Sequence, residues 1–315
     1  MLNRRHLRIK VLQTVYAFSQ SNNTNLVGGE KELVHGINKM YDLYIYYLTM
    51  FDSFTHFAEI KMEEAKRKNF TTDEDLNPNL KFVENRFIVL LKNNLAIKNA
   101  SLKTKVNWSA DVEQNVLLKL YNYLVTTETY INYMESDANS FDEDRQFIIK
   151  LFKKEICNFE LLLDYFQEKS VYWQDDIDLV CSMVIKTLKS FKSPEDDLSP
   201  ILPLYKDDEE EFAKKLFMRG IQELDDNEEL VAKYTKNWEA ERIALMDRLL
   251  MSLAITEAKA FPYIPTKVTL NEYIEISKFY STPKSNTFIN GVLDKVFTDL
   301  QKDGVIKKIG RGLIK

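Results

Sequence analysis

The stretch NTFINGVLDKV, residues 286–296, decides the structure of the C-terminal part of the chain. Its apolar residues recur at the spacing of one helix face, and they are Phe288, Val292, Leu293 and Val296. Gly291 lies among them, although glycine inside a helix costs about 1 kcal/mol relative to alanine. Because the chain has only eight glycines in 315 residues, we interpret Gly291 as a packing residue that lets another backbone come very close.

Helical spacing extends outward from this stretch over nearly the whole chain. The C-terminal patterns predict helices at residues 208–225, 227–236, 238–260, 267–280 and 283–303. An aromatic-rich pattern predicts one very long helix from about Glu30 to Lys68, which is either a buried central helix or a surface for association. No strand of any length is convincing, so the predicted fold class is all-α.

The composition predicts a folded cytoplasmic protein. Hydrophobic residues make up 45% of the chain and charged residues 29%, which is typical of globular domains. The first twenty residues do not form a signal peptide, because charges interrupt the apolar part and no small-residue cleavage site follows. No apolar run approaches the roughly 18 residues of a membrane span. Cys157 and Cys181 lack metal-like neighbours, so we expect reduced thiols.

Charge is distributed unevenly, although the net value is only −5. Residues 1–20 contain Arg4, Arg5, Arg8 and Lys10 and no acid, and the C-terminal tail is basic as well. The clearest boundary lies at residues 193–206, an acidic segment that contains three of the seven prolines. We expect a linker or an exposed connection there.

Catalytic chemistry has no candidate residues in this sequence. The three histidines, His6, His35 and His56, are far apart, and no phosphate-binding glycine loop, nucleophile elbow or zinc spacing is present. Acidic pairs such as Asp175/Asp176 fit helix starts, where the helix dipole favours them. We therefore predict a protein that is not an enzyme and that has no cofactor and no metal.

The first helix points to binding instead. It has two apolar stripes, and the second stripe, with Tyr16, either packs inside one bundle or docks a separate protein. Arg4, Arg5 and Arg8 lie at the start of this helix, where the dipole disfavours cations. Two explanations are open for this placement: an anionic partner, or a flexible basic N-terminus.

Two segments resemble the NusB family. The opening NRRHLRIKVLQTVYAFSQ is similar to the family's arginine cluster and first helix, roughly RRxARExALQxLY. The segment IPTKVTLNEYIEISKFYSTPKSNTFINGVLDKV resembles the C-terminal block, typically VPxKVxINEAIELAKxF followed by KFVNGVLDKI. The resemblance implies a NusB-like helical bundle made of residues 1–20 and 205–315. Residues 28–200, which have no counterpart in short members, would form an inserted helical subdomain, and residues 193–206 a linker.

The resemblance also implies a function. Members of the family are transcription antitermination factors that bind the small-subunit ribosomal protein NusE. Together the two proteins hold boxA RNA in the leaders of ribosomal RNA operons and help RNA polymerase to resist termination, without catalysis. By position, the implied RNA-binding residues are Arg4, Arg5, Arg8, Tyr234, Lys284, Asn286 and Phe288. Phe288 suits stacking on an unpaired base, with core packing as the alternative.

The expected contacts with the protein partner are Tyr16 and Asp247, the latter being alternatively a solvated residue of an amphipathic helix. The chain departs from the family pattern at Lys284, where other members often carry an acid, and at His6, which replaces an arginine of the cluster. These departures concern the RNA sequence preference more than RNA binding itself.

Two alternatives belong to other classes. The first is a helical scaffold that uses the NusB-like module for protein contacts alone, which the acidic net charge favours and the basic chain ends oppose. The second is the helical RNA-binding domain of a ribosomal RNA methyltransferase, which the absence of a glycine-rich cofactor loop opposes.

Overall fold

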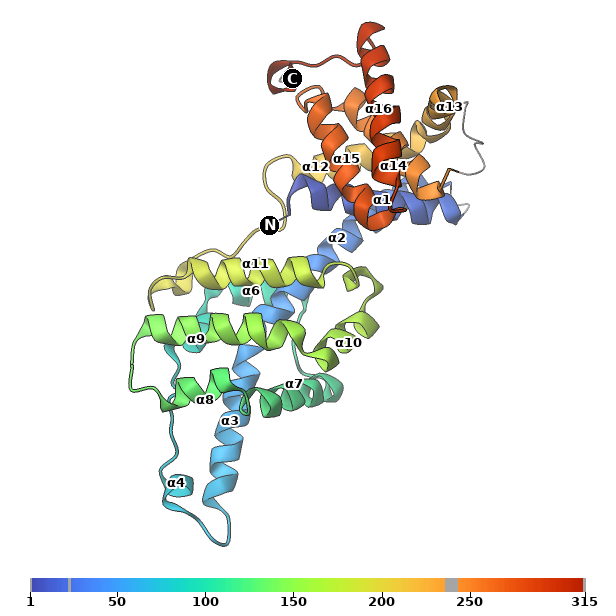
Figure 1. The fold of residues 1–315 in the computed structure, drawn as a ribbon. Coiled ribbons are helices and arrows are strands. Elements are labelled where there is room, and N and C mark those ends of the chain that lie inside the picture. The colour runs from blue at the N-terminus through green and yellow to red at the C-terminus, as the bar shows by residue number, and fades with distance from the viewer. Residues whose placement is uncertain (1, 22–23, 236–242, 314–315) are drawn as a thin grey trace. The chain divides into compact units, whose positions relative to one another are not determined.

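The computed structural model describes residues 2–21, 24–235 and 243–313. All regular elements in these ranges are helices, which confirms the predicted all-α class. The chain divides into two compact units (Figure 1). Unit 1 consists of Met1–Ile37 and Leu204–Lys315, and unit 2 is Asn38–Pro203. In the described ranges, no helix is both long enough and apolar enough to cross a membrane.

Unit 1 is built from the two ends of the chain. Its helices are α1 (Arg4–Gln20), the start of α2 (Leu26–Thr49), α12 (Glu209–Gln222), α13 (Leu224–Tyr234), α14 (Leu245–Ala260), α15 (Thr266–Tyr280), α16 (Ser285–Lys302) and the short η5 (Gly310–Leu313). The five helices predicted after the acidic segment are therefore present. The predicted helix 238–260 begins in residues 238–242, which lie outside the described residues.

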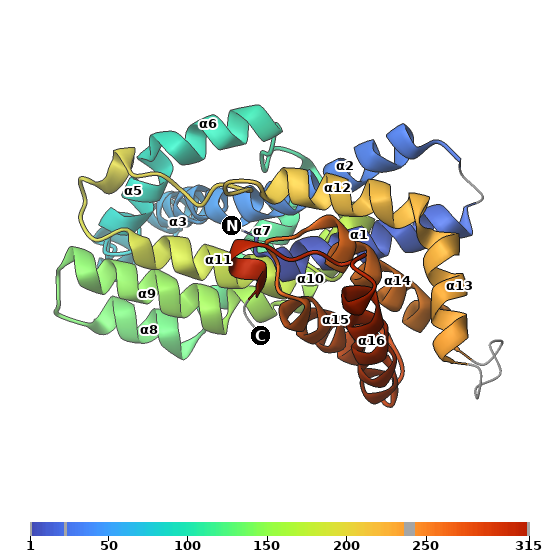
Figure 2. The ribbon, with the colours of Figure 1, turned by 90° about the horizontal axis from the view of Figure 1, so that it is seen from above.

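Helix α14 lies at the centre of unit 1. It packs against α1, α12, α13, α15 and α16, and Figure 2 shows this group of helices from above. Most of its residues are buried, including Leu249, Leu250, Leu253 and Ala254. A helix that is apolar on all sides must be covered on all sides. Helix α1 supplies part of that cover, although it lies far away in the sequence.

Unit 1 also includes the start of α2. Gly29 of this helix lies between two rings, because a Cβ added there would be 2.6 Å from Phe217 and 2.9 Å from Phe18. The insertion was predicted to begin at residue 28, whereas unit 2 begins at Asn38. The close packing at Gly29 is the physical reason why this turn of helix belongs with α1 and α12.

Unit 2 contains the remaining helices. They are the rest of α2, α3 (Phe51–Lys66), α4 (Asp73–Leu76), α5 (Arg86–Asn93), α6 (Leu95–Thr104), α7 (Asp111–Leu124), α8 (Glu128–Glu135), α9 (Phe141–Lys154), η1 (Ile156–Asn158), α10 (Glu160–Lys169), η2 (Val171–Trp173), α11 (Ile177–Ser190) and η3 (Asp196–Leu198). The single helix predicted from Glu30 to Lys68 is wrong in one respect, because it breaks at Met50 into α2 and α3. The apolar pattern continues across this break, so the spacing alone could not reveal it.

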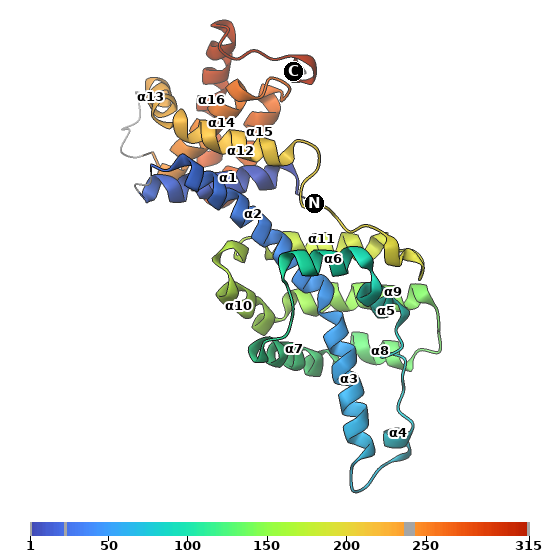
Figure 3. The ribbon, with the colours of Figure 1, turned by 180° about the vertical axis from the view of Figure 1, so that it is seen from behind.

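The aromatic residues of α2 form the core of unit 2. Tyr47 packs edge-on against Phe152 and Phe166, with ring centroids 5.3 and 5.1 Å apart, and Tyr46 packs against Trp108 at 4.9 Å. Helix α3 continues the core against α5 and α7 (Figure 3). Of the two alternatives for this aromatic segment, the buried central helix is the one observed.

The acidic connection is held to unit 2 in part. The side-chain amide of Asn94, at the start of α6, donates to the backbone carbonyls of Asp196 and Ser199 at 3.2 and 3.0 Å. Asn94 itself is fully buried. Residues 196–199 are therefore a structured part of unit 2, and the description of residues 193–206 as a linker needs that correction.

Phe166 provides a test of this core. It is fully buried and its ring contacts those of Tyr46, Tyr47 and Trp173. Replacing it by alanine should lower the free energy of unfolding by about 3–5 kcal/mol, because the ring leaves a cavity. Urea unfolding followed by tryptophan fluorescence measures this loss. The control is Phe70→Ala, since Phe70 is 92% exposed; equal effects of the two changes would contradict the assigned core.

Candidate nucleic-acid interface

The start of α1 is fixed by a reciprocal cap. The side chain of Asn3 accepts the backbone N–H of His6 at 3.1 Å, and the His6 ring accepts the backbone N–H of Asn3 at 3.5 Å. Such a capping box satisfies two donors that a helix start leaves unpaired. His6, the departure from the family's arginine cluster, therefore has a local structural role. Burial lowers the pKa of its ring below the usual value, which favours the neutral form that can accept this hydrogen bond.

The arginines that follow the cap bind carboxylates of the chain itself. Arg4 donates to both oxygens of Asp208, at 2.8 and 2.9 Å. Arg5 donates to both oxygens of Glu272, at 2.8 Å each. The cations at the positive end of the helix dipole thus have anionic partners within unit 1. The alternative of a flexible basic N-terminus is wrong for these two residues.

Arg8 forms a buried ion pair. Its guanidinium donates to both oxygens of Glu257 in α14 at 2.7 Å, and the two residues are 2% and 0% exposed. Burial alone would lower the pKa of Arg8, but the adjacent Glu257 carboxylate outweighs it, so the pKa is raised. The prediction that Arg8 neutralises RNA phosphates is therefore wrong, because its side chain is almost completely buried and is paired with Glu257.

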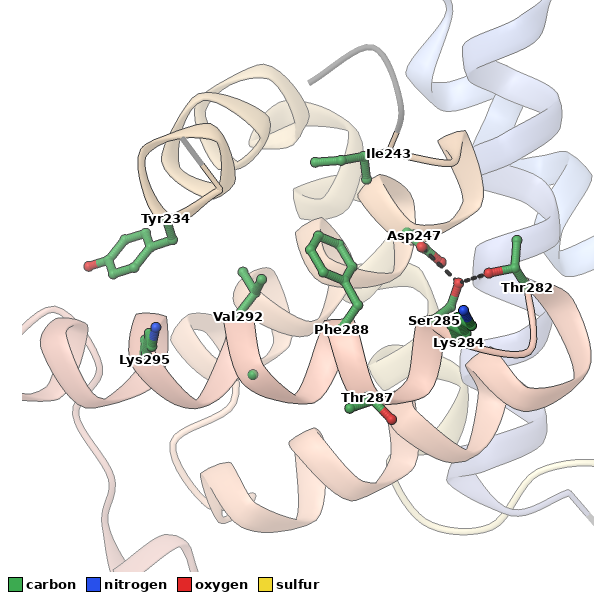
Figure 4. Close-up of a pocket in the computed structure, with 11 residues that line it drawn as sticks. Tyr234, Ile243, Asp247, Thr282, Lys284, Ser285, Thr287, Phe288, Val292 and Lys295 are labelled. Carbon is green, nitrogen blue, oxygen red and sulfur yellow. Dashed lines mark hydrogen bonds between the residues drawn. The ribbon is translucent and has the colours of Figure 1, made fainter. Parts of the chain in front are cut away.

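Asp247 is also buried, which overturns its predicted contact with a protein partner. It is 6% exposed at the start of α14, and its carboxylate accepts hydrogen bonds from the hydroxyls of Ser281 and Ser285, the latter at 2.8 Å. Thr282 and Ser285 share a further hydrogen bond of 2.8 Å. This polar group ties the start of α16 to α14 (Figure 4).

A groove with a volume of about 700 Å³ lies beside the first turns of α16. Figure 4 shows Phe288 and Val292 on the side of α16 that faces Ile243 and Tyr234. The described residues that line the groove are Tyr234, Ile243, Asp247, Thr282, Lys284, Ser285, Thr287, Phe288, Gly291, Val292 and Lys295. The groove thus combines an apolar wall with a polar edge.

The charge of this groove is positive. Lys284 and Lys295 are exposed, and neither forms an ion pair with any residue that the structure describes. Asp247, the acid among the described lining residues, is buried with its oxygens hydrogen-bonded. Tyr234 donates its hydroxyl hydrogen to Asp299 at 3.0 Å, which fixes the ring at the far end of the groove.

The structure thus brings together three of the predicted RNA-binding residues, Tyr234, Lys284 and Phe288. Asn286 lies in the same turn outside the described lining, and its side-chain oxygen accepts the backbone N–H of Thr287 at 2.7 Å. Among the described lining residues, none comes from α1, so the arginines and Tyr16 are not part of the groove. Lys295 was missed, although it follows Phe288 by seven positions and so lies on the same helix face.

Gly291 does not have the role that the sequence suggested. It is exposed, and a Cβ built on it would meet no described atom within 4 Å. The predicted close approach of another backbone of the chain is therefore wrong. Gly291 lies on the surface of α16 and lines the groove.

Unit 1 is thus an all-α module with a groove whose edge carries two exposed lysines. A model of the NusB family matches residues 182–298, from within α11 to within α16. The transcription antitermination protein NusB of Salinibacter ruber is 41% identical over 138 residues, which are 42% of this chain and 86% of the relative. This chain belongs to the NusB family, whose members are not enzymes.

Two further relatives carry the same description. The transcription antitermination protein NusB of Chloroherpeton thalassium is 42% identical over 104 residues, 33% of this chain and 49% of the relative. That of Dictyoglomus turgidum is 34% identical over 103 residues, 33% of this chain and 69% of the relative. No solved structure matches this chain.

The contribution of the buried Arg8–Glu257 ion pair to stability can be tested by substitution. Arg8→Leu should lower the free energy of unfolding by about 3–5 kcal/mol, because it leaves the Glu257 carboxylate buried without its partner. The double variant Arg8→Leu/Glu257→Leu should recover most of the loss, since no unpaired charge remains. Amide hydrogen exchange of α1 and α14 measures the local stability. Equal loss in the single and double variants would contradict this account of the pair.

Proposed function

We propose that this protein is a cytoplasmic transcription antitermination factor. In this proposal it binds boxA-type single-stranded RNA from the leaders of ribosomal RNA operons, together with the ribosomal protein NusE, and acts on RNA polymerase within the antitermination complex. The observation that carries the proposal is the groove beside α16, in which an aromatic ring and apolar side chains lie between two exposed lysines. Membership of the NusB family supports it.

The composition of the groove suits a single strand of RNA. Unpaired bases offer flat apolar faces, and the phosphates that join them are anionic. Phe288 and Val292 supply apolar surface, and Lys284 and Lys295 supply positive charge at the two ends. Base–aromatic stacking contributes about 1–3 kcal/mol per base. Stacking and electrostatic attraction do not distinguish one base from another. A preference for an RNA sequence would therefore depend on polar side chains nearby, such as those of Asn286 and Thr287.

Arg4 and Arg5 have a secondary place in this proposal. Their side chains are 36% and 44% exposed, and a phosphate that contacts either one must share or replace its hydrogen bonds to Asp208 or Glu272. Arginine can serve two acceptors because its guanidinium carries five N–H donors. The lysines of the groove, which have no such competitor in the described structure, should contribute more to RNA affinity.

Tyr16 remains the proposed contact with NusE. It lies on α1 and is 41% exposed, so part of its side chain is accessible to a partner. Partly apolar aromatic residues often contribute strongly to protein interfaces. Asp247 is not part of this proposal, because of its burial.

A second candidate function is a protein-binding scaffold without RNA binding. The pairing of all three N-terminal arginines with carboxylates favours it, because the expected basic cluster is neutralised within the chain. The two candidates differ at the groove, where only the first requires Lys284 and Lys295.

Charge reversal at the groove separates these candidates. Lys284→Glu/Lys295→Glu should weaken binding of a short boxA-type RNA by about tenfold or more and reduce the salt slope by about 0.7 for each lost phosphate contact. Fluorescence anisotropy across a salt series, with NusE present, measures both quantities. The control is Lys302→Glu, which changes a 71% exposed lysine of the same helix outside the groove. Equal RNA affinity of all three proteins would overturn the assignment.

The proposed protein contact has its own test. Tyr16→Ala should weaken NusE binding by about 1–2 kcal/mol, as expected for an interface aromatic, and should leave thermal stability nearly unchanged because the ring is partly exposed. Isothermal titration calorimetry measures the affinity. Val27→Ala, at a 62% exposed position of α2, is the control. If Tyr16→Ala binds NusE as the unchanged protein does, the contact lies elsewhere.

A further inference from the structure

Neither the backbone conformation nor the packing of the described residues requires a glycine at position 291. It lies in the middle of α16, at a helical position where alanine is more favourable by about 1 kcal/mol. Its φ is not among the positive values recorded in the described chain, so the backbone does not require glycine. The position is exposed, and no atom of the described residues lies within 4 Å of the site of a Cβ.

Two other glycines inside helices show what a packing glycine looks like in this chain. A Cβ at Gly220 would lie 2.6 Å from Cδ2 of Leu253, and one at Gly29 would lie 2.6 Å from Cζ of Phe217. Both distances are far below a normal carbon–carbon contact of about 3.5–4.0 Å. Each of these glycines therefore makes room for a neighbour within unit 1, whereas Gly291 has no such neighbour among the described residues.

The surroundings of Gly291 indicate what could come close to it. Phe288 and Val292 precede and follow it on the wall of the groove, and Lys284 and Lys295 lie on either side along the helix, roughly 16 Å apart. An occupant that reaches both lysines must pass over the backbone between them. The charge favours an anionic chain, and the bare backbone suits a flat group, because glycine allows a ligand to approach the main chain closely.

We propose that one nucleotide of a bound RNA strand lies in van der Waals contact with the α16 backbone at Gly291, in the space that a Cβ would fill. This inference rests on the proposed function and deepens it, because it makes Gly291 a determinant of RNA affinity. The absence of a side chain lets the nucleotide reach the helix while the flanking phosphates stay near Lys284 and Lys295. The helix gives up intrinsic stability for this contact.

The two effects of a side chain at this position are opposite in sign. Gly291→Ala should leave the thermal midpoint of unfolding unchanged or raise it, because alanine favours the helix and meets no described atom. The same change should weaken RNA binding at least fivefold, since the methyl group displaces the nucleotide. Gly291→Leu should weaken it further. A loss of RNA affinity without a loss of stability is the signature that a purely structural role would not give.

The experiment measures the affinity of the full chain with NusE for a fluorescent boxA-type RNA, alongside thermal unfolding. Asn290→Ala is the matched control, because Asn290 is an exposed neighbour that lines a different groove, between α15 and α16. The inference is supported if Gly291→Ala binds RNA more weakly than the unchanged protein and Gly291→Leu more weakly still. Asn290→Ala should bind RNA with the affinity of the unchanged protein. If the unchanged protein binds RNA through Lys284 and Lys295 but Gly291→Ala binds equally well, the inference is wrong and the proposed function stands.

Other outcomes bear on both proposals. If the unchanged protein does not bind the RNA, the proposed function fails and the inference fails with it. If RNA affinity is unaffected by Gly291→Ala but NusE affinity falls, the occupant of the groove is a protein segment, which also overturns the inference.

Discussion

The ion pair between Arg8 and Glu257 joins the first helix of the chain to the central helix of unit 1. Both groups are buried and bound through two hydrogen bonds of 2.7 Å. Thr269 of α15 donates a further hydrogen bond to the same carboxylate at 2.8 Å. A buried charge without a partner is strongly destabilising. The pair therefore favours the register of α1 on α14 that brings these two charges together.

This constraint makes a single module from segments that are far apart in the sequence. The chain leaves unit 1 after Ile37 and returns to it at Leu204, and residues 38–203 between these points make up unit 2. They form their own core around the aromatic residues of α2 and α3. The N-terminal arginines serve the construction of unit 1, through Glu257, Glu272 and Asp208. In the groove beside α16, by contrast, Lys284 and Lys295 are exposed and form no ion pair with a described residue.

The sequence predicted the helices well because their apolar spacing is regular. It predicted the groove residues Lys284, Phe288 and Tyr234 through the resemblance of the C-terminal block. It could not predict the burial of Arg8 and Asp247, because burial depends on which distant carboxylate or hydroxyl meets the side chain. Arg4, Arg5 and Arg8 look alike in the sequence, and only their partners distinguish a structural arginine from an exposed one.

Gly291 is the converse case, because the sequence predicted a packed residue and the structure shows an exposed one. Helical periodicity places it among apolar residues, and packing was the natural interpretation. Gly291 lies in the sequence between Phe288 and Val292, but on the helix it lies at the edge of the buried face. No described atom lies within 4 Å of a Cβ built there. A spacing rule identifies the face of a helix, but it does not tell whether a neighbour or a ligand fills the space beside it.

The central claim is that RNA binds along α16. Photo-crosslinking tests it most directly, with a boxA-type RNA that carries 4-thiouridine and with mass spectrometry of the crosslinked peptides from the full chain. The account predicts crosslinks in the peptides that contain residues 284–295. Crosslinks confined to unit 2, or to α1 and α12 on the arginine side of unit 1, would contradict it.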